Sequence, residues 1–209
     1  MYERPLVGGG GHRDKKILWL EGGVAVAAKA GSTPELMTQA RCEVAAWLLA
    51  LELEMTKLVP TTVMRKMPAA AGGEVECSAQ VMWTQFKMAL GGGFTHTDCP
   101  DETGWHIAVF DVLAANIDRH DGNWGAIDAM PDAVLVDHGH CFTKSPNTTS
   151  QFYVARQGQQ IPDGALALVQ KFVDDSDRTR LKEVLDQPIV QQVIDRAQHL
   201  VHGGVLALP

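Results

Sequence analysis

Short apolar runs separated by turn residues occupy the first thirty positions of the chain, a pattern that predicts antiparallel β-strands. Residues 2–7 and 17–29 carry strand-like runs. Four consecutive glycines within 8–14 separate these runs, and two more at 22–23 interrupt the second one. Because glycine supplies the backbone conformations that tight turns need, the pattern predicts a three-stranded antiparallel meander.

The spacing of apolar positions then changes from a strand period to a helical one. Ser32 and Glu35 stand at capping-box spacing, and Pro34 lies where a missing N–H group does no harm, so a helix is predicted to begin here. Its apolar face continues to about residue 55. The residues that recur at helical spacing are Leu36, Ala40, Val44, Trp47, Leu48 and Leu51.

Two further strand-like runs, 60–67 and 74–83, are joined around Gly72 and Gly73. Together with the meander they predict a five-stranded sheet on which the single helix packs. Residues 1–83 are therefore predicted to form an N-terminal lobe.

The middle of the chain returns to helical spacing after a Gly- and Thr-rich linker at 91–100. The predicted helix covers 101–117, and its apolar stripe consists of Ile107, Phe110, Ala114 and Ile117. A hairpin is predicted next, in which 123–128 pairs with 133–137 around a turn at 130–132.

The C-terminal third is predicted to be mainly helical. Residues 140–160 are polar and irregular, and short helices are expected to start near Pro162, Asp175 and Pro188. Residues 84–209 would then form a reduced, mainly helical C-terminal lobe, and the two lobes together one domain.

Composition narrows the functional classes. The chain of 209 residues is 45% hydrophobic and 21% charged, which is typical of a soluble globular protein. It contains no apolar run long enough for a membrane span and no secretory signal pattern, so a cytoplasmic location without membrane insertion is expected. The formal charge of −7 argues against binding nucleic acid.

Lys29 and Glu43 are the first candidates for chemistry. Lys29 follows Ala25 and Ala27 on one face of an apolar strand, while Glu43 lies beside the buried stripe of the following helix. A buried ammonium and a buried carboxylate are each costly alone and tolerable as a pair. Alternatively, Lys29 is a strand-end cation and Glu43 a solvated helix residue, but their joint placement upstream of an acidic motif favours the pair.

That acidic motif is the most informative segment of the sequence. Asp118, Arg119, His120 and Asn123 lie just past a predicted helix end, and Asp137 follows a predicted strand and precedes a glycine and a histidine. Phosphoryl transfer from Mg·ATP needs one carboxylate near the acceptor hydroxyl and an Asn and Asp for the metal. Asp118 fits the first role, and Asn123 and Asp137 fit the second. The alternatives are a chance D-x-x-x-x-N spacing and an Asp137 that only caps a turn.

The four glycines at 8–11 are a weaker signal. Gly9 and Gly10 could let backbone N–H groups approach phosphates, but the run lacks G-x-G-x-x-G spacing and could equally be a flexible turn.

These motifs resemble the phosphatidylinositol 3- and 4-kinase-like superfamily, whose signatures are D-R-H-x-x-N and D-F-G-H. The order Asp118-Arg119-His120 matches this group, whereas ordinary protein kinases have H-R-D. The segments 41–47 and 58–63 also resemble its small bacterial members. The resemblance covers roughly residues 20–200 and implies a two-lobed α+β fold of the protein-kinase type.

By this resemblance, Lys29 is the ATP lysine, Glu43 its partner, Asp118 the base, and Asn123 and Asp137 the ligands of Mg²⁺, with Mn²⁺ as an alternative ion. His120 would assist the acceptor or the transferring phosphate. The strand that ends at 80–83 would lead into a hinge whose backbone pairs with adenine. The hinge residues are Val81, Met82 and Trp83.

Two departures from the superfamily pattern bear on which acceptor is expected. His138 replaces the usual Phe after the metal-binding Asp, which is expected to remove an apolar packing element. The segment after His140 offers only Lys144 and Arg156 as cations, fewer than a phosphoinositide headgroup would need. The sequence therefore predicts an ATP-dependent kinase whose first-choice acceptor is a protein Ser or Thr hydroxyl. A phosphoinositide or small-molecule kinase, and a nucleotide-binding pseudokinase that regulates a partner, are the alternatives.

Overall fold

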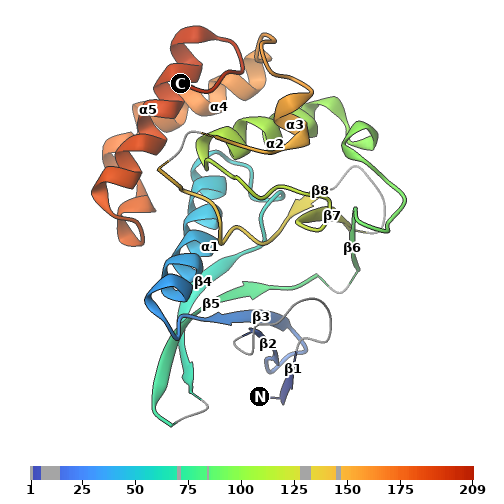
Figure 1. The fold of residues 1–209 in the computed structure, drawn as a ribbon, viewed down its shortest axis with the longest axis vertical. Helices are drawn as coiled ribbons and strands as arrows, with labels where there is room; N and C mark the ends of the chain where they lie inside the picture. Colours follow the sequence, from blue (N-terminus) through green and yellow to red (C-terminus); the bar gives the residue numbers. More distant parts are fainter. Residues whose placement is uncertain (1, 6–14, 70–71, 84, 128–132, 145–146) are drawn as a thin grey trace.

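The computed structural model describes residues 2–5, 15–69, 72–83, 85–127, 133–144 and 147–209 (Figure 1). An antiparallel sheet with one helix forms the N-terminal part, and most of the remaining helices lie together in the C-terminal part. This arrangement confirms the predicted fold class.

The N-terminal sheet has five antiparallel strands in the order β1-β2-β3-β5-β4. The turn between β2 and β3 uses Gly22 and Gly23, whose φ angles of 92° and 82° favour glycine. The predicted meander is therefore confirmed over the described residues. The five strands are β1 (Tyr2–Pro5), β2 (Lys15–Trp19), β3 (Ala25–Ala30), β4 (Thr62–Pro68) and β5 (Glu74–Val81).

Helix α1 (Pro34–Glu52) follows β3 and packs against β3, β4 and β5. Its N-cap is Thr33, whose hydroxyl accepts a hydrogen bond from the Leu36 amide at 3.2 Å. The predicted cap at Ser32 is wrong by one position. Proline disfavours helical geometry in the residue before it, so Thr33 stays extended, and Pro34 begins the helix.

A second, three-stranded sheet lies between the large sheet and the helices (Figure 1). Its strands are β6 (Phe86–Met88), β7 (Trp124–Ile127) and β8 (Ala133–Leu135), all antiparallel. The predicted hairpin is confirmed as β7–β8, although its predicted turn lies outside the described residues. Strand β6 was not predicted, because three residues are too few to establish a period.

The C-terminal helices are α2 (Asp101–Leu113), α3 (Gln151–Val154), α4 (Asp163–Asp174) and α5 (Gln187–Gly203). Helix α2 ends four residues before the predicted limit, since Ala115 takes a positive φ of 45°. Ile117 is consequently 39% exposed instead of joining the buried stripe. Short 3₁₀ helices η1 (His96–Asp98), η2 (Ser176–Arg178) and η3 (Arg180–Glu183) occupy the connections.

One large hydrophobic core joins α1 to the C-terminal helices. Leu49 of α1, Phe110 of α2 and Val193 of α5 are all completely buried members of it. Helix α1 is thus fixed between the sheet and the helical part. The predicted lobe boundary between residues 83 and 84 stays a prediction. Over the described residues, no helix has both the length and the apolar character needed to span a bilayer.

Candidate active site

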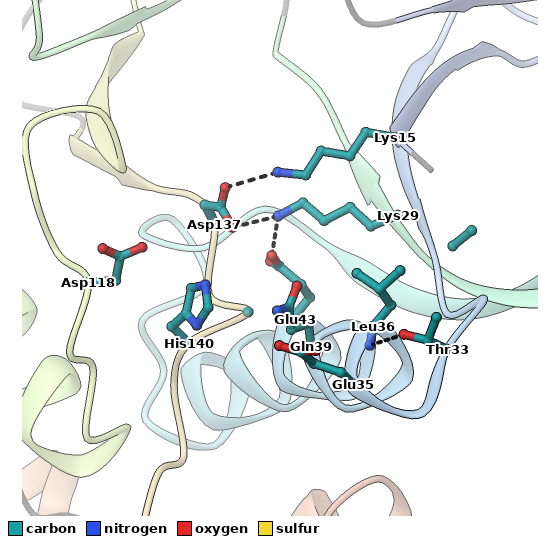
Figure 2. A pocket seen from close by; sticks show the side chains of 12 residues that line it. Lys15, Lys29, Thr33, Glu35, Leu36, Gln39, Glu43, Asp118, Asp137 and His140 are labelled. Carbon is teal, nitrogen blue, oxygen red and sulfur yellow. Dashed lines mark hydrogen bonds and ion pairs between the residues drawn. The ribbon is translucent and has the colours of Figure 1, made fainter. Parts of the chain in front are cut away.

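A cavity of about 410 Å³ lies where β2, β3 and α1 face the segments around residues 118 and 137. Its volume is within the range of small-molecule binding sites. Figure 2 shows Lys15 and Lys29 pointing toward Asp137 from one side, with Asp118 on the other side of Asp137. The lining residues are Lys15, Lys29, Ala30, Thr33, Glu35, Leu36, Gln39, Glu43, Asp118, Asp137, Gly139 and His140.

Lys29 is the centre of an ion-pair network in this cavity. Its Nζ donates a hydrogen bond to Glu43 Oε1 and another, of 2.8 Å, to Asp137 Oδ1. Glu43 is almost completely buried on α1, while the Lys29 and Asp137 side chains keep some exposure. The predicted Lys29–Glu43 pair is therefore present, and the structure adds Asp137 to it.

The charges of this network support one another. Burial alone would lower the pKa of Lys29, but the Glu43 and Asp137 carboxylates outweigh burial and raise the pKa above its usual value. Burial alone would raise the pKa of Glu43 and of Asp137, but the Lys29 ammonium outweighs it and lowers both. All three side chains are consequently ionised at neutral pH.

Lys15 is a cavity residue that the sequence analysis missed. It stands directly opposite Lys29 in the β2–β3 register, and its Nζ lies 3.5 Å from Asp137 Oδ2. Directly opposed residues on antiparallel strands share one face, where like charges are destabilising unless an anion lies between them. Asp137 is that anion in this structure. The available signal was the register, since a three-residue connection at 21–23, closed by a hydrogen bond from the Leu20 amide to the Val24 carbonyl, places Lys15 opposite Lys29.

Asp118, His120 and Asn123 lie on the segment between α2 and β7. Asp118 is 40% exposed and His120 61%, and His120 Nε2 is 3.8 Å from Asp118 Oδ1. Asn123 is buried, and its Nδ2 donates to the Asp118 backbone carbonyl at 2.8 Å and to Oδ2 at 3.3 Å. The amide thus fixes the conformation of the loop that presents the Asp118 carboxylate.

Arg119 connects this loop to the Asp137 segment. Its guanidinium is fully buried and pairs with the buried carboxylate of Asp111 on α2 at 3.2 Å. The same group donates to the backbone carbonyls of Asn123 and Val136. One side chain therefore holds both loops on one helix. This role was hard to predict, because the sequence motif does not show that the Arg119 side chain is buried.

Asp137 lies beyond the end of β8 in a left-handed backbone conformation, with a φ of 56°. Asparagine and aspartate tolerate this conformation better than most residues. The Asp137 carboxylate lines the cavity, while the side chain of the next residue, His138, is completely buried.

The polar His138 side chain does not leave the packing position empty. Its ring packs edge-on against Phe110, with 5.8 Å between the ring centroids and 77° between the planes. An imidazole is aromatic and flat, so it takes the packing place of a phenyl ring at this position.

The donor set around Asp137 fits a hard divalent cation. Asp137 supplies a carboxylate in the cavity, and the backbone carbonyl of Asn123 accepts a 3.0 Å hydrogen bond from the amide of Val136, beside Asp137, although Asn123 and His120 are not among the residues that line the cavity. Mg²⁺ is bound in such sites by one or two protein oxygens together with phosphates and water. No group of three His, Cys, Asp or Glu side chains that could hold a metal ion by itself occurs in the described part of the chain.

The remaining predicted nucleotide contacts are only partly described. Val81 ends β5, and the Met82 amide donates to the Ala25 carbonyl at 2.9 Å, so that amide is already engaged in a continuation of the β3–β5 pairing. Val81, Met82 and Trp83 are not among the residues that line the cavity. Gly9 and Gly10 lie outside the described residues.

Comparison with solved structures shows a kinase-like fold. The crystal structure of the Helicobacter pylori proinflammatory kinase CtkA aligns with a TM-score of 0.53, over 98% of this chain and 93% of that chain. The sequences are 13% identical, so the likeness extends to the fold alone. The sequence matches no protein-family model and no curated protein.

Proposed function

We propose that the protein is an ATP-dependent kinase that transfers the γ-phosphoryl group of Mg·ATP to a hydroxyl acceptor. One observation carries the proposal: Lys29 binds Glu43 and Asp137 at once, in a cavity that Asp118 also lines. A strand lysine paired with a helix glutamate beside a metal-binding aspartate is the arrangement that active kinases require. The kinase-like fold agrees with it.

The two lysines would bind the phosphates. Each now donates to a different oxygen of Asp137, and a phosphate oxygen would replace that acceptor when nucleotide enters. Asp137 and the Asn123 side-chain oxygen would hold Mg²⁺, which would neutralise the charge of the phosphates. Glu43 keeps Lys29 in position throughout, because its carboxylate is buried on α1 and does not reach solvent.

Asp118 would act on the acceptor. Its exposed carboxylate orients the hydroxyl and accepts its proton while the hydroxyl oxygen forms a bond to the γ-phosphorus. The bond from that phosphorus to the β–γ bridging oxygen breaks, and ADP leaves. His120, 3.8 Å from Asp118, is placed to contact the acceptor or the transferring group.

A protein Ser or Thr is the first-choice acceptor. Of the two cations considered after His140, Arg156 is bound to Asp101 at 2.9 Å and lies over the Trp105 ring. Only Lys144 is left for a phosphoinositide headgroup, and the cavity wall carries Glu35. A scan of proteins, phosphoinositides and small alcohols with γ-labelled ATP would identify the class.

Turnover measurements test the proposal. Asp118→Ala and Asp137→Ala should each lower ATP consumption by at least about 100-fold, the usual contribution of a general base or metal ligand. Asp177→Ala is the matched control, since Asp177 is exposed on η2. If all four proteins consume ATP at one background rate, the catalytic proposal fails. Nucleotide-dependent thermal stabilisation without turnover would instead support a pseudokinase.

A further inference from the structure

His138 has a polar edge that the packing of its ring does not explain. The ring is completely buried, and neither nitrogen has a hydrogen-bond partner among the described residues. The T-shaped contact with Phe110 accounts for the packing of the ring but offers it no polar atom. A buried imidazole with two unpartnered nitrogens is costly, so a polar group close to hydrogen-bond distance is the one to consider.

That group is the second oxygen of Glu43. Oε1 of this carboxylate accepts from Lys29, whereas Oε2 is buried and has no hydrogen bond among the described residues. His138 Nδ1 lies 3.7 Å from Oε2. Two unpartnered buried groups, one a donor and the other an ionised acceptor, thus face each other a few tenths of an ångström beyond hydrogen-bond distance.

We infer that His138 is a positioning residue, whose Nδ1–H donates to Glu43 Oε2 and holds the carboxylate that in turn holds Lys29. The inference rests on the proposed function, because Lys29 is the lysine proposed to bind the phosphates. His138 follows Asp137 directly, so Lys29, Glu43, His138 and Asp137 form a closed ring of contacts. Helix α1 is thereby tied to the metal-binding segment.

Chemistry supports the direction of this hydrogen bond. An imidazole carries at least one N–H group whether it is neutral or protonated, so the His138 ring can donate. The lowered pKa of Glu43 keeps the carboxylate an acceptor only. A phenylalanine at position 138 would preserve the contact with Phe110 but leave Glu43 Oε2 buried without a partner.

Two substitutions at position 138 separate positioning from packing. Asn retains an N–H donor near the place of Nδ1 but fills less space, and Phe fills the space but has no donor. We expect His138→Phe to raise the KM for ATP by about 10-fold, the effect of losing a hydrogen bond to a charged group, and His138→Asn to retain most of the affinity. A purely structural role predicts that His138→Asn raises the KM for ATP more than His138→Phe does, and that result would overturn the inference.

His96 is a matched control. Its ring also lies edge-on to a phenylalanine, Phe152, at 6.0 Å, and its Nδ1 is also buried without a partner among the described residues. Because no carboxylate of the cavity is involved, His96→Phe should be tolerated at least as well as His96→Asn. If the same substitution, Phe or Asn, were the better tolerated one at both positions, the inference would be overturned.

A double-mutant cycle tests the contact without relying on catalysis. His138→Phe, Glu43→Gln and the double variant are compared by their unfolding equilibrium constants in denaturant. A contact predicts that the two effects deviate from additivity by about 5-fold or more, and additive effects would exclude it. Non-additivity in a protein that shows no ATP turnover would retain the contact and reject the proposed function instead.

Discussion

At the scale of single residues, Asp137 is the acceptor that two opposed lysines share. Lys15 and Lys29 face each other across β2 and β3, and each ammonium reaches a different Asp137 oxygen. Lys29 is also fixed by buried Glu43, whereas Lys15 has no second acceptor among the described hydrogen bonds. Lys15 is therefore the lysine that can move with an entering phosphate.

Replacing Lys15 tests this difference. Lys15→Met should raise the KM for ATP by about 10-fold through loss of one charged hydrogen bond, with a smaller change in kcat. Lys29→Met should lower both affinity and kcat, because Glu43 then loses its buried partner. Lys66→Met, an exposed change on β4, is the control. Equal KM values for Lys15→Met and Lys66→Met would remove Lys15 from the phosphate site.

Glu43 should make stability depend on acid pH. Its pKa is lowered in the folded protein, so its contribution is present above its unfolded pKa and is lost as pH falls through the folded value. The free energy of unfolding of wild type should exceed that of Glu43→Gln by about 3 kcal/mol at neutral pH, since the substitution breaks a buried pair.

The pH dependence of that difference is the decisive readout. Denaturant unfolding at a series of pH values should show the gap between the two proteins closing only below about pH 4, where the Glu43 carboxylate of the unfolded chain becomes protonated while that of the folded protein is still ionised. A gap that stays constant across the acid range would mean that the charge of Glu43 adds no stability.

At the scale of elements, α2 positions both chemical loops through one buried ion pair. Arg119 bonds Asp111 on α2 and also the backbone carbonyls of Asn123 and Val136. Asn116 adds a 2.9 Å hydrogen bond to the same Asp111 carboxylate. The separation between the Asp118 loop and the Asp137 segment is consequently set by a rigid helix.

Arg119→Met should destabilise the fold by about 3–5 kcal/mol, because it leaves Asp111 as an uncompensated buried charge. Turnover of the remaining folded protein should also fall, since both loops lose their common support. Arg178→Met is the control, because Arg178 is an exposed residue of η2. Denaturant unfolding and turnover at one temperature measure the two effects. An unchanged unfolding midpoint would contradict the assigned role of Arg119.

At the scale of the whole molecule, two kinds of feature were predicted from the sequence. They are the helices and strands whose apolar residues recur regularly, and the cavity residues that belong to sequence motifs. The five-stranded sheet, α1 and the β7–β8 hairpin were predicted, and Lys29, Glu43, Asp118 and Asp137 do meet in one cavity. The spacing of apolar residues could not reveal β6 or α3, because these elements have only three and four residues.

Contacts between distant segments were harder to predict than the elements themselves. Lys15 reaches Asp137 over 122 positions of sequence, and His138 faces Glu43 from a segment that the sequence assigns only to a loop. Such pairings depend on strand register and on how α1 packs against the segment around residue 138, neither of which a local pattern contains.

The Mg²⁺ dependence of ATP affinity tests the central claim most directly, because it needs no knowledge of the acceptor. Calorimetric titration of wild type should show ATP binding at least about 10-fold tighter with Mg²⁺ than with a chelator. Asp137→Asn should remove that difference, and Asp177→Asn should retain it. Equal affinity with and without Mg²⁺ in wild type, or a Mg²⁺ effect that survives in Asp137→Asn, would contradict the proposal that Asp137 binds the metal beside the phosphates.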